Sequence, residues 1–317
     1  MPFFSIVIPL YNKEKFIADT LKSILAQTFT DYEVIVVDDV STDGSRGVAE
    51  AFSGKFHSGF KVIAHQRNRG LSAARNTGIR NATSDRIAFI DADDAWKPDF
   101  LAKMHTLIHE FPEAGIYASG YEEKYPDGKA LSVHKNLDFA PGEMNVVPDF
   151  FAANAHQPIF WYGSAVVRRE VFDAVGYFDE TITYGEDTDF NIRAGQQFKM
   201  AYCNRVCASY TMASENQITR SSLSQKTITD FGKYEADAKG NPSLKKFLDV
   251  NRYILAIAYK LEGNDEKFTA LAKAIDSRNL TTSQRFLLHA PGFAVQLIRK
   301  IKLFFLKRGV RLTTFRK

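Results

Sequence analysis

The first half of the chain alternates short apolar runs with amphipathic segments. Runs rich in β-branched residues at 4–8, 33–37, 60–64 and 86–90 predict strands, and apolar residues at helical spacing predict a helix over 17–25. Strands that are apolar almost throughout, and that are separated by helices, are typical of a parallel sheet covered on both faces. The pattern therefore predicts an α/β fold, with a mostly parallel sheet flanked by helices.

The second half has a weak pattern at first and a helical one later. Residues 121–160 are rich in Pro, Gly and Asn, which favours loops and short edge strands, whereas 163–167 predict a strand and 168–175 a helix. From about residue 224 the pattern is helical, and one stripe is formed by Tyr253, Ile254, Ile257, Ala258 and Leu261. We expect a boundary between the first unit and a helical C-terminal region near 215–225.

The composition is that of an ordinary folded protein, with 317 residues, 45% of them hydrophobic and 25% charged. These values exclude a disordered chain and a disulfide scaffold. The two cysteines, Cys203 and Cys207, have no Cys or His zinc spacing around them, so we expect reduced thiols on or near a strand. No window approaches the ~18 apolar residues of a membrane span, and the run 3–10 lacks the features of a secretory signal. We expect a cytoplasmic protein.

The net charge of +4 is the sum of two unlike parts. Residues 292–317 carry eight basic side chains and no acidic one, so the remainder, with 33 basic and 37 acidic side chains, has a charge of −4. On a helix, one face is formed by Ala294, Leu297, Ile298, Ile301, Phe304 and Phe305. The basic residues lie around the rest, although Leu303 and Leu306 interrupt the separation. Such a helix suits an anionic membrane surface, which would make the protein peripheral at the inner face of the cytoplasmic membrane. The alternative is a helix packed on protein with its basic side solvated. No nucleic-acid recognition motif accompanies these charges, so we expect no nucleic-acid partner.

An acidic group follows one of the predicted strands directly. Asp91, Asp93 and Asp94 come at the end of the run 86–90, and in open sheets ligands bind beyond the carboxyl ends of the strands. Three carboxylates at such an edge repel one another unless a cation is bound, and Mg²⁺ or Mn²⁺ bridging a diphosphate would supply that charge. The alternative is an acidic turn that caps the following helix.

Two further groups have the chemistry of a nucleotide site. Asp39 ends the second predicted strand, where it could accept from a nucleobase imide or a ribose hydroxyl, although the run 41–45 could equally be a turn and helix cap. The block 67–76 places three arginines around Gly70 and a helix start, which favours an anion. Neither a Walker sequence nor a G-x-G-x-x-G motif occurs.

The last group is Glu186 and Asp187. A carboxylate beside a bound electrophile can act as a general base. The alternative is that Asp187 or its neighbour Thr188 opens a helix that runs through Asp189 and Arg193.

Taken together, these groups resemble family 2 of the GT-A glycosyltransferases, the inverting, bacterial-type enzymes. The resemblance covers about residues 3–215, and its matching stretches are 5–12, 37–45, 68–76, 91–94 and 176–187. It implies a catalytic unit over 1–222, with a nucleotide-sugar half of about 1–120 and an acceptor half of about 121–222. The helical region 223–317 would then be an extension that ends in the basic amphipathic helix.

The resemblance also implies a role for each candidate residue. It implies a nucleotide-sugar site formed by Pro9, Tyr11, Asp39, Asn68, Arg75, Asp91 and Asp94, with Tyr11 on the base and Asp39 on its imide edge. A divalent metal, Mn²⁺ or Mg²⁺, would be held by Asp93, with Asp91 as a second contact. Asp187 would be the catalytic base, and Glu186 would orient it or meet the acceptor.

One departure from the family concerns the metal. Many members place a histidine after the base, whereas here no histidine occurs between His156 and His289. The resemblance then implies a metal held by Asp93, the diphosphate and water, with Glu215 or Asn216 as a further ligand.

The predicted function is inverting transfer of a hexosyl or N-acetylhexosaminyl group from a nucleotide-sugar to a hydroxyl of a glycan or lipid-linked glycan. UDP is the expected nucleotide, rather than GDP or dTDP, only because the family that the chain resembles commonly uses it. One alternative is a sugar-phosphate nucleotidyltransferase, but residues 9–12 are not the Gly-rich loop that such enzymes use. Another is a nucleotide-sugar-binding module without catalysis, against which the retained Asp91, Asp93 and Asp187 argue.

Overall fold

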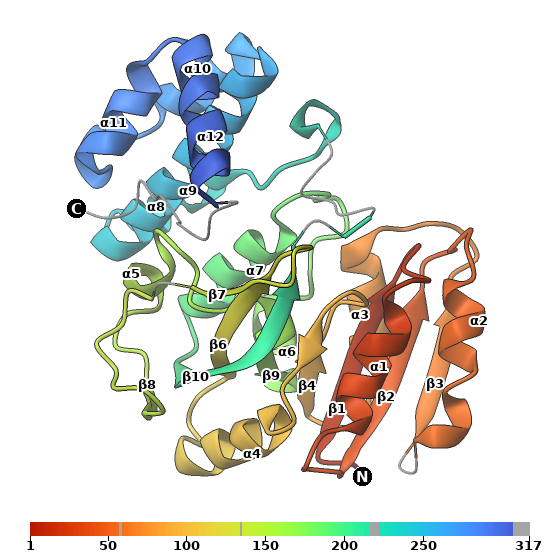
Figure 1. The fold of residues 1–317 in the computed structure, drawn as a ribbon. Coiled ribbons are helices and arrows are strands. Elements are labelled where there is room, and N and C mark those ends of the chain that lie inside the picture. The colour runs from red at the N-terminus through yellow and green to blue at the C-terminus, as the bar shows by residue number, and fades with distance from the viewer. Residues whose placement is uncertain (57–58, 134, 213, 216–221, 307–317) are drawn as a thin grey trace.

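A single mixed sheet organises the protein (Figure 1). The structure is a computed structural model, and it describes residues 1–56, 59–133, 135–212, 214–215 and 222–306. Eight of the sheet's strands follow the order β3-β2-β1-β4-β9-β6-β10-β5, while β7 pairs with β6 and β8 with β10.

The predicted strands of the first half all form. They are β1 (Phe4–Leu10), β2 (Tyr32–Asp38), β3 (Phe60–Ala64) and β4 (Arg86–Phe89), and their mutual pairings are parallel. The connecting helices are α1 (Ile17–Leu25), α2 (Ser45–Glu50) and α3 (Leu71–Asn81). Because β1, β2 and β4 point the same way, the acids that follow β2 and β4 meet at one edge of the sheet.

The sheet continues with strands of both directions. The predicted strand near 165 is β9 (Ala165–Arg168), which lies antiparallel between β4 and β6 (Ile116–Lys124), and β10 (Met200–Thr211) is parallel to β6. The short strands are β5 (Ala95–Trp96), β7 (Ala130–Ser132) and β8 (Met144–Val146). The prediction of loops and short edge strands over 121–160 is wrong for 121–124, where the long inner strand β6 continues to Lys124, and for the helix at 150–154.

The remaining helices cover the sheet and form the C-terminal region. Those of the sheet region are α4 (Phe100–Glu110), α5 (Phe150–Asn154), α6 (Arg169–Val175) and α7 (Glu186–Gly195). The C-terminal helices are α8 (Glu235–Ala238), α9 (Pro242–Glu262), α10 (Asp265–Lys273), α11 (Thr282–His289) and α12 (Gly292–Leu306). They gather at one end of the molecule, away from β1–β3 (Figure 1).

The long helix α9 has clear sequence signals at both ends. The Asn241 side chain accepts from the backbone N–H of Leu244, Pro242 occupies the first turn, and Gly263 ends the helix with φ of 75°. Its buried side chains Phe247, Leu255 and Tyr259 belong to the same hydrophobic cluster as residues of the sheet, such as Phe89 and Phe172. The C-terminal region therefore shares a core with the sheet, and the expected division at residue 222 stays a prediction.

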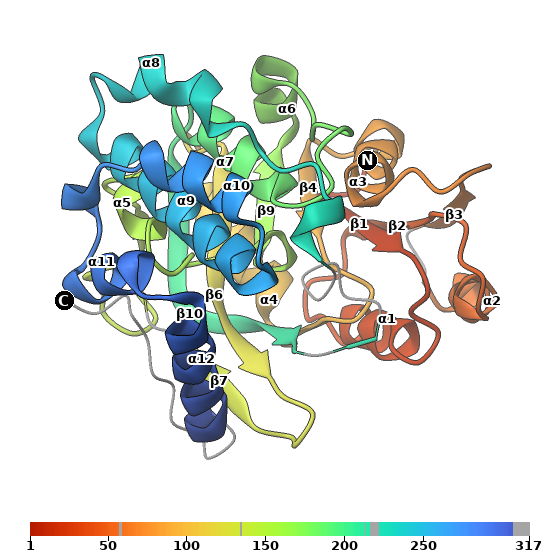
Figure 2. The same ribbon diagram turned by 90° about the horizontal axis from the view of Figure 1, so that it is seen from above.

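The predicted C-terminal helix is α12. Val295 is buried, and Ala294 and Ile298 pack on a cluster formed with α9 and α11. The exposed apolar side chains of α12 are Phe293, Leu297, Ile301, Phe304 and Phe305. Seen from above, α12 extends out from the other C-terminal helices (Figure 2). The basic residues expected from 307 to 317 lie outside the described residues. No helix in the described ranges combines the length and the apolar character needed to cross a bilayer.

Candidate active site

A cavity of about 680 Å³ opens at the edge where β1, β2 and β4 end. Its walls come from both expected halves of the catalytic unit and from the C-terminal region. The candidate residues that line it are Pro9, Tyr11, Asp39, Asn68, Arg75, Asp91, Asp93, Glu186 and Asp187. Among the described candidates, Asp94 and Glu215 are not part of this wall.

The Asp39 carboxylate organises the end of the cavity where the resemblance implies a nucleotide. Its Oδ1 accepts from the backbone N–H of Arg69 (2.8 Å) and lies 2.6 Å from His65 Nδ1, and its Oδ2 accepts from the backbone N–H of Gly70 (2.7 Å). Asn68 Nδ2 donates to the Asp39 carbonyl oxygen (3.0 Å). Asp39 therefore fixes the loop that leads into α3, and its expected contact with a nucleobase stays a prediction.

Tyr11 is a rare exposed aromatic side chain. The residue is 43% exposed, although it follows the buried strand β1 directly, and it lines the cavity. An aromatic face held open at a cavity mouth suits stacking on a planar ring.

Arg75 joins the two carboxylate groups of the site. The side chain is buried on α3, with Nη2 donating to Asp91 Oδ1 (3.2 Å) and Nη1 donating to Glu186 Oε1 (2.9 Å). Its guanidinium also lies over the rings of Tyr162 and Phe178. Asp91 and Glu186, which are far apart in the sequence, are thus both bonded to the Arg75 guanidinium.

α3 lies very close to β1 one turn after Arg75. A Cβ at Gly78 would lie 2.2 Å from Val7 Cγ1, so only glycine fits this approach without a shift. The close packing places the Arg75 side chain beside the ends of the parallel strands.

Lys13, which sequence reasoning missed, neutralises Asp93. Lys13 Nζ donates to Asp93 Oδ2 (2.7 Å), to Ser214 Oγ (3.0 Å) and to the Glu215 carbonyl oxygen (2.6 Å), and Ser214 Oγ also donates to Asp93. The side chains of Lys13 and Asp93 are nearly buried. Lys13 adjoins the matching stretch 5–12, but no local pattern connects it with a residue 80 positions away.

Asp94 lies behind the cavity wall. It is 2% exposed, its Oδ1 accepts from the backbone N–H of Thr211 (2.7 Å), and its Oδ2 accepts from Trp161 Nε1 (3.2 Å). Trp161 and Tyr210, at the end of β10, both line the cavity. In this structure Asp94 holds the Trp161 side chain and the backbone at the end of β10, and its expected contact with a donor sugar stays a prediction.

Glu186 and Asp187 lie in the first turn of α7, which runs through Asp189 and Arg193 as the helix alternative predicts. The helix begins after Gly185, however, so neither Asp187 nor Thr188 is its cap. Asp187 Oδ1 accepts from the backbone N–H of Thr188 (2.8 Å), and its side chain lines the cavity. Burial raises the pKa of Glu186 to about 7, and Asp187 adds to the rise, while Arg75 opposes it. The two carboxylates thus lie in different environments, one buried and ion-paired and the other half-buried at the cavity.

The acids after β4 suit a cation. Burial raises the pKa of Asp91, with Asp93 adding to the rise and Arg75 opposing it, and burial with the charges of Asp93 and Asp91 raises the pKa of Asp94 well above its ordinary value. Within the described part of the chain, no group of three or more His, Cys, Asp or Glu side chains is arranged to hold a metal ion. Asp91 and Asp93 therefore fit a hard divalent cation only as part of a shell that phosphate oxygens and water complete.

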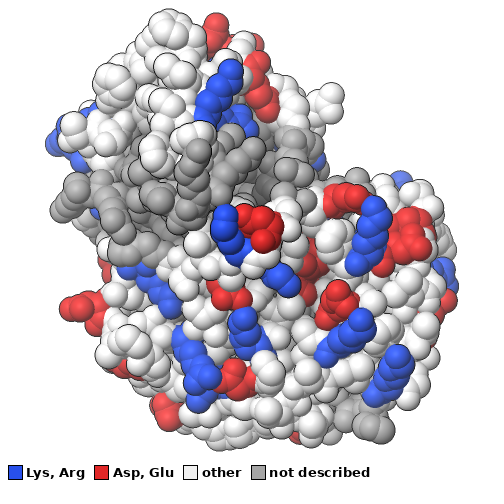
Figure 3. All heavy atoms as spheres, in the orientation of Figure 1, with Lys and Arg blue, Asp and Glu red and all other residues white. Residues whose placement is uncertain are grey.

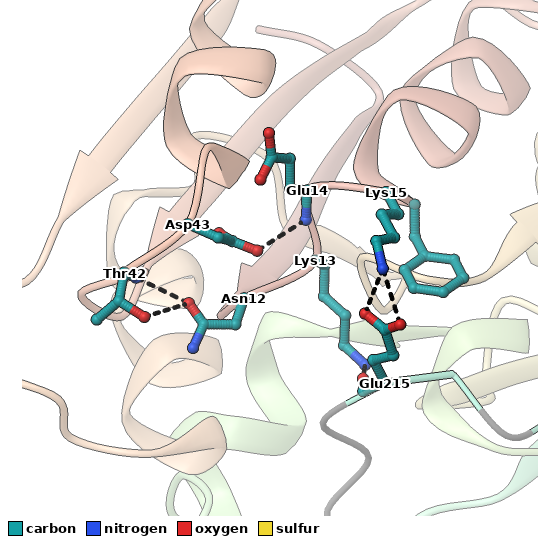
Figure 4. A pocket seen from close by; sticks show the side chains of 8 residues that line it. Asn12, Lys13, Glu14, Lys15, Thr42, Asp43 and Glu215 are labelled. Carbon is teal, nitrogen blue, oxygen red and sulfur yellow. Dashed lines mark hydrogen bonds and ion pairs between the residues drawn. The ribbon is translucent and has the colours of Figure 1, made fainter.

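A smaller hollow of about 320 Å³ lies beside Lys13 (Figure 4). Its polar walls are bonded to one another: Asn12 Oδ1 accepts from the backbone N–H of Thr42 (2.8 Å), and Lys15 Nζ pairs with the Glu215 carboxylate (2.8 Å). The expected role of Glu215 as a metal ligand stays a prediction, and Asn216 lies outside the described residues.

Comparisons of the sequence with a family profile and with curated proteins agree on one family. The sequence profile described as "Glycosyl transferase family 2" matches residues 5–176. The uncharacterized glycosyltransferase EpsJ of Bacillus subtilis (strain 168) is 34% identical over 200 residues, which are 61% of this chain and 56% of EpsJ. The amylovoran biosynthesis glycosyltransferase AmsB of Erwinia amylovora is 30% identical over 271 residues, which are 82% of this chain and 85% of AmsB. The chain spans about half the length of the first curated relatives it matches.

A solved structure gives the same fold. Residues 1–349 of S. aureus TarS, crystallised with UDP-GlcNAc, superpose with a TM-score of 0.65 at 19% identity, covering 97% of this chain and 92% of that one. The predicted GT-A fold is confirmed.

Proposed function

Because the chain belongs to glycosyl transferase family 2, we propose that it transfers a sugar from a nucleotide-sugar to a hydroxyl of a glycan or lipid-linked glycan with inversion at the anomeric carbon. The observation that carries the proposal is the Arg75 bridge. The Arg75 guanidinium bonds to Asp91, which belongs to the acidic group, and to Glu186, which is next to the candidate base. All three side chains line one cavity. Donor and acceptor chemistry can therefore meet at a single place.

The nucleotide would lie at the end formed by 1–120. Tyr11 would stack on the base, Asp39 would accept from its edge, and Arg75, already paired with carboxylates, would frame the diphosphate side of the cavity. UDP is the proposed nucleotide, supported by the UDP-GlcNAc bound to TarS, which has the same fold.

A divalent cation would be held by Asp93, with Asp91 as a second contact. When bound, it would offset the charge that develops on the leaving diphosphate. Lys13 would hold the Asp93 carboxylate in place through the ion pair described above.

Asp187 would act as the general base. It would take the proton from the acceptor hydroxyl while that oxygen forms a bond to the anomeric carbon, and the bond from that carbon to the diphosphate oxygen would break with its electron pair leaving on the nucleotide. Glu186, held by Arg75, would keep the first turn of α7 facing the cavity.

We also propose that α12 meets an anionic membrane surface, which would bring a lipid-linked acceptor to the cavity. Large apolar side chains are exposed along this helix, and no acidic residue occurs from 277 to 317. Apolar side chains would enter the interface, and nearby basic residues would each add about 1 kcal/mol. By contrast, Figure 3 shows acidic and basic side chains mixed over the sheet region of one face.

A screen of sugar nucleotides with Mn²⁺ tests the reaction class. We expect release of UDP from one UDP-sugar, slowly in water and faster with an acceptor. Release of pyrophosphate from a nucleoside triphosphate with a sugar phosphate would instead support the nucleotidyltransferase alternative. Binding of a nucleotide-sugar without any turnover would support the non-catalytic module.

A further inference from the structure

The wall of the large cavity that faces away from the nucleotide end comes from the C-terminal region. This wall, which we call the C-terminal wall, is formed by Lys226, Thr229, Phe231, Asn251, Ile254 and Leu255. The profile match ends at residue 176, so the wall lies entirely outside the stretch that identifies the family.

Ile254 is the most unusual member of the wall. The helical pattern predicts it as part of the core stripe of α9, yet its side chain is 39% exposed. Among the described residues, the large apolar side chains exposed outside α11 and α12 are Met1, Tyr11 and Ile254, and the last two both line this cavity. An apolar side chain held open at each end of a cavity points to a ligand that covers both.

Hydrogen bonds tie the wall to the segment that carries the candidate base. Thr229 Oγ1 donates to the Gly185 carbonyl oxygen (2.9 Å), and the backbone N–H groups of Thr183 and Tyr184 donate to the Thr227 carbonyl oxygen (2.9 and 3.2 Å). These bonds lie immediately before Asp187. The position of the wall relative to the base is therefore fixed by the backbone.

An ion-pair network holds α9 against α8. Arg252 is buried, and its Nη1 lies 2.5 Å from Glu235 Oε1 and 3.2 Å from Asp249 Oδ1, while Lys245 Nζ bonds to the same Asp249 oxygen (2.9 Å). The Asn251 side chain is oriented by its own bond, from Nδ2 to the Phe247 carbonyl oxygen (2.8 Å). The side chains that α9 presents to the cavity are thus set by their neighbours.

The mixture of side chains in the wall fits a sugar. Ile254 offers an exposed apolar surface that the buried side chains of Leu255 and Phe231 support, and Asn251 offers a neutral hydrogen-bonding group beside it. Sugar rings combine an apolar face of C–H groups with an edge of hydroxyls, and pockets that bind such ligands join apolar area with a few placed polar groups.

We propose that the C-terminal wall is the acceptor subsite, and that it takes the neutral sugar ring whose hydroxyl is attacked by the transfer reaction. The apolar face of that ring lies on Ile254, and its edge meets Asn251, which directs a hydroxyl toward Asp187. This inference rests on the proposed glycosyl transfer, and it assigns acceptor choice to residues 226–255.

The experiment uses the full chain, the sugar nucleotide found by the screen, and methyl α- and β-glycosides of glucose, galactose, mannose and N-acetylglucosamine as acceptor probes. UDP release is measured with and without each probe. Ile254→Asp and Asn251→Ala are compared with Ile257→Ala, which shortens a half-buried side chain of α9 outside the cavity.

We expect both test variants to raise the KM for an accepted glycoside about tenfold or more, as loss of a pocket contact does, while UDP affinity and hydrolysis of the donor in water stay within about twofold of the parent. The Ile257→Ala control should behave as the parent. Retained UDP affinity shows that the variants are folded.

Two results would overturn the subsite. One is an unchanged KM in both test variants, and the other is a parent enzyme that hydrolyses the donor but responds to none of the glycosides, which would exclude a neutral sugar ring. A parent that hydrolyses no sugar nucleotide would overturn the proposed transfer itself, so the two failures are distinguishable.

Discussion

The two ends of the large cavity are built in different ways. At the nucleotide end, Asp39 and Asp91 directly follow parallel strands, and Asp39 is held by backbone groups only 30 residues away. At the acceptor end, the C-terminal wall, Trp161 and the first turn of α7 come from segments that are far apart in the chain.

This difference shows which part of such a site can be predicted from short stretches of sequence. The carboxyl ends of adjacent parallel strands always meet at one edge, so a nucleotide end built there depends on few contacts. The acceptor end depends on the packing of distant helices and loops. We therefore expect substitutions to separate the two ends cleanly, and the predictions below test that separation in order of expected effect.

The largest effect is expected at Asp187, where the two ends meet. Asp187→Asn should lower transfer by roughly 10²–10⁴-fold, because general-base assistance is lost, while UDP affinity stays unchanged. Steady-state transfer and calorimetry with UDP measure the two quantities. Asp173→Asn, an exposed carboxylate on α6, is the matched control. Transfer near the parent rate by Asp187→Asn would show that another group is the base.

A second effect is expected at Asp93, confined to the nucleotide end. Asp93→Asn should reduce the gain in UDP affinity on adding Mn²⁺ by roughly 10–100-fold, because a charged oxygen ligand of the metal is lost. The Asn side chain still has an oxygen that can accept the hydrogen bond from Lys13. Calorimetry with UDP, with and without Mn²⁺, measures this gain. Asp99→Asn, which changes a carboxylate paired with Arg205 outside the cavity, is the control. An unchanged metal dependence would remove Asp93 from the metal site.

A smaller effect is expected on α12, outside both ends. Ile301→Asp should weaken binding to vesicles of phosphatidylglycerol and phosphatidylcholine about tenfold, because burial of one large apolar side chain is lost. Gln296→Asp makes the same change of charge at an exposed position off the apolar stripe, and it should bind nearly as the parent does. Flotation measures both. A parent protein that does not float with these vesicles would exclude the membrane surface.

The smallest effect is expected from Glu186 and concerns stability. Its pKa of about 7 in the folded protein lies above its ordinary value, so the folded state binds more protons than the unfolded state between about pH 4.5 and 7. Ionisation of Glu186 therefore lowers the stability of the parent as the pH rises through this window. Glu186→Gln has no carboxyl group to ionise at this position, so its stability does not fall in this way. Its melting temperature should therefore rise relative to that of the parent from pH 5 to pH 8.

Glu180→Gln is the control for this measurement. Although burial opposes it, hydrogen bonds from Asn76 and Arg69 lower the pKa of Glu180, so its stabilisation is lost only as the pH falls below about 4.5. Its melting temperature relative to the parent should be constant from pH 5 to pH 8. The same constancy for Glu186→Gln would contradict the raised pKa.

The strands of the first half were predictable because they are apolar almost throughout. Strand β6 was not predicted, and β10 was expected only as a strand on or near the two cysteines, because polar residues such as Glu122, Glu123 and Arg205 interrupt the apolar pattern of both strands. Both strands lie inside the sheet, where pairing with neighbours on two sides determines their structure.

The candidate residues were predictable where they follow a strand or start a helix. Among the described candidates, the cavity brings together all except Asp94, which is buried behind Trp161, and Glu215, which lines the smaller hollow. Lys13 and Ile254 were missed for opposite reasons. Lys13 acts through a partner that is distant in sequence, and Ile254 belongs by its periodicity to a core stripe although it faces the cavity.

One contact of α7 has a consequence for engineering. Asp189 is almost fully buried, and its Oδ1 accepts from the Tyr234 hydroxyl and pairs with Lys233 Nζ, both at 2.6 Å. A chimera that received residues 223–262 from a relative with another acceptor would carry its own partners for this position. If they lack a hydroxyl and an amine there, Asp189 Oδ1 would lose both partners, and the buried carboxylate would keep only its ion pair with Arg193 (3.0 Å). The exchange should therefore include position 189 as well as the segment that it anchors.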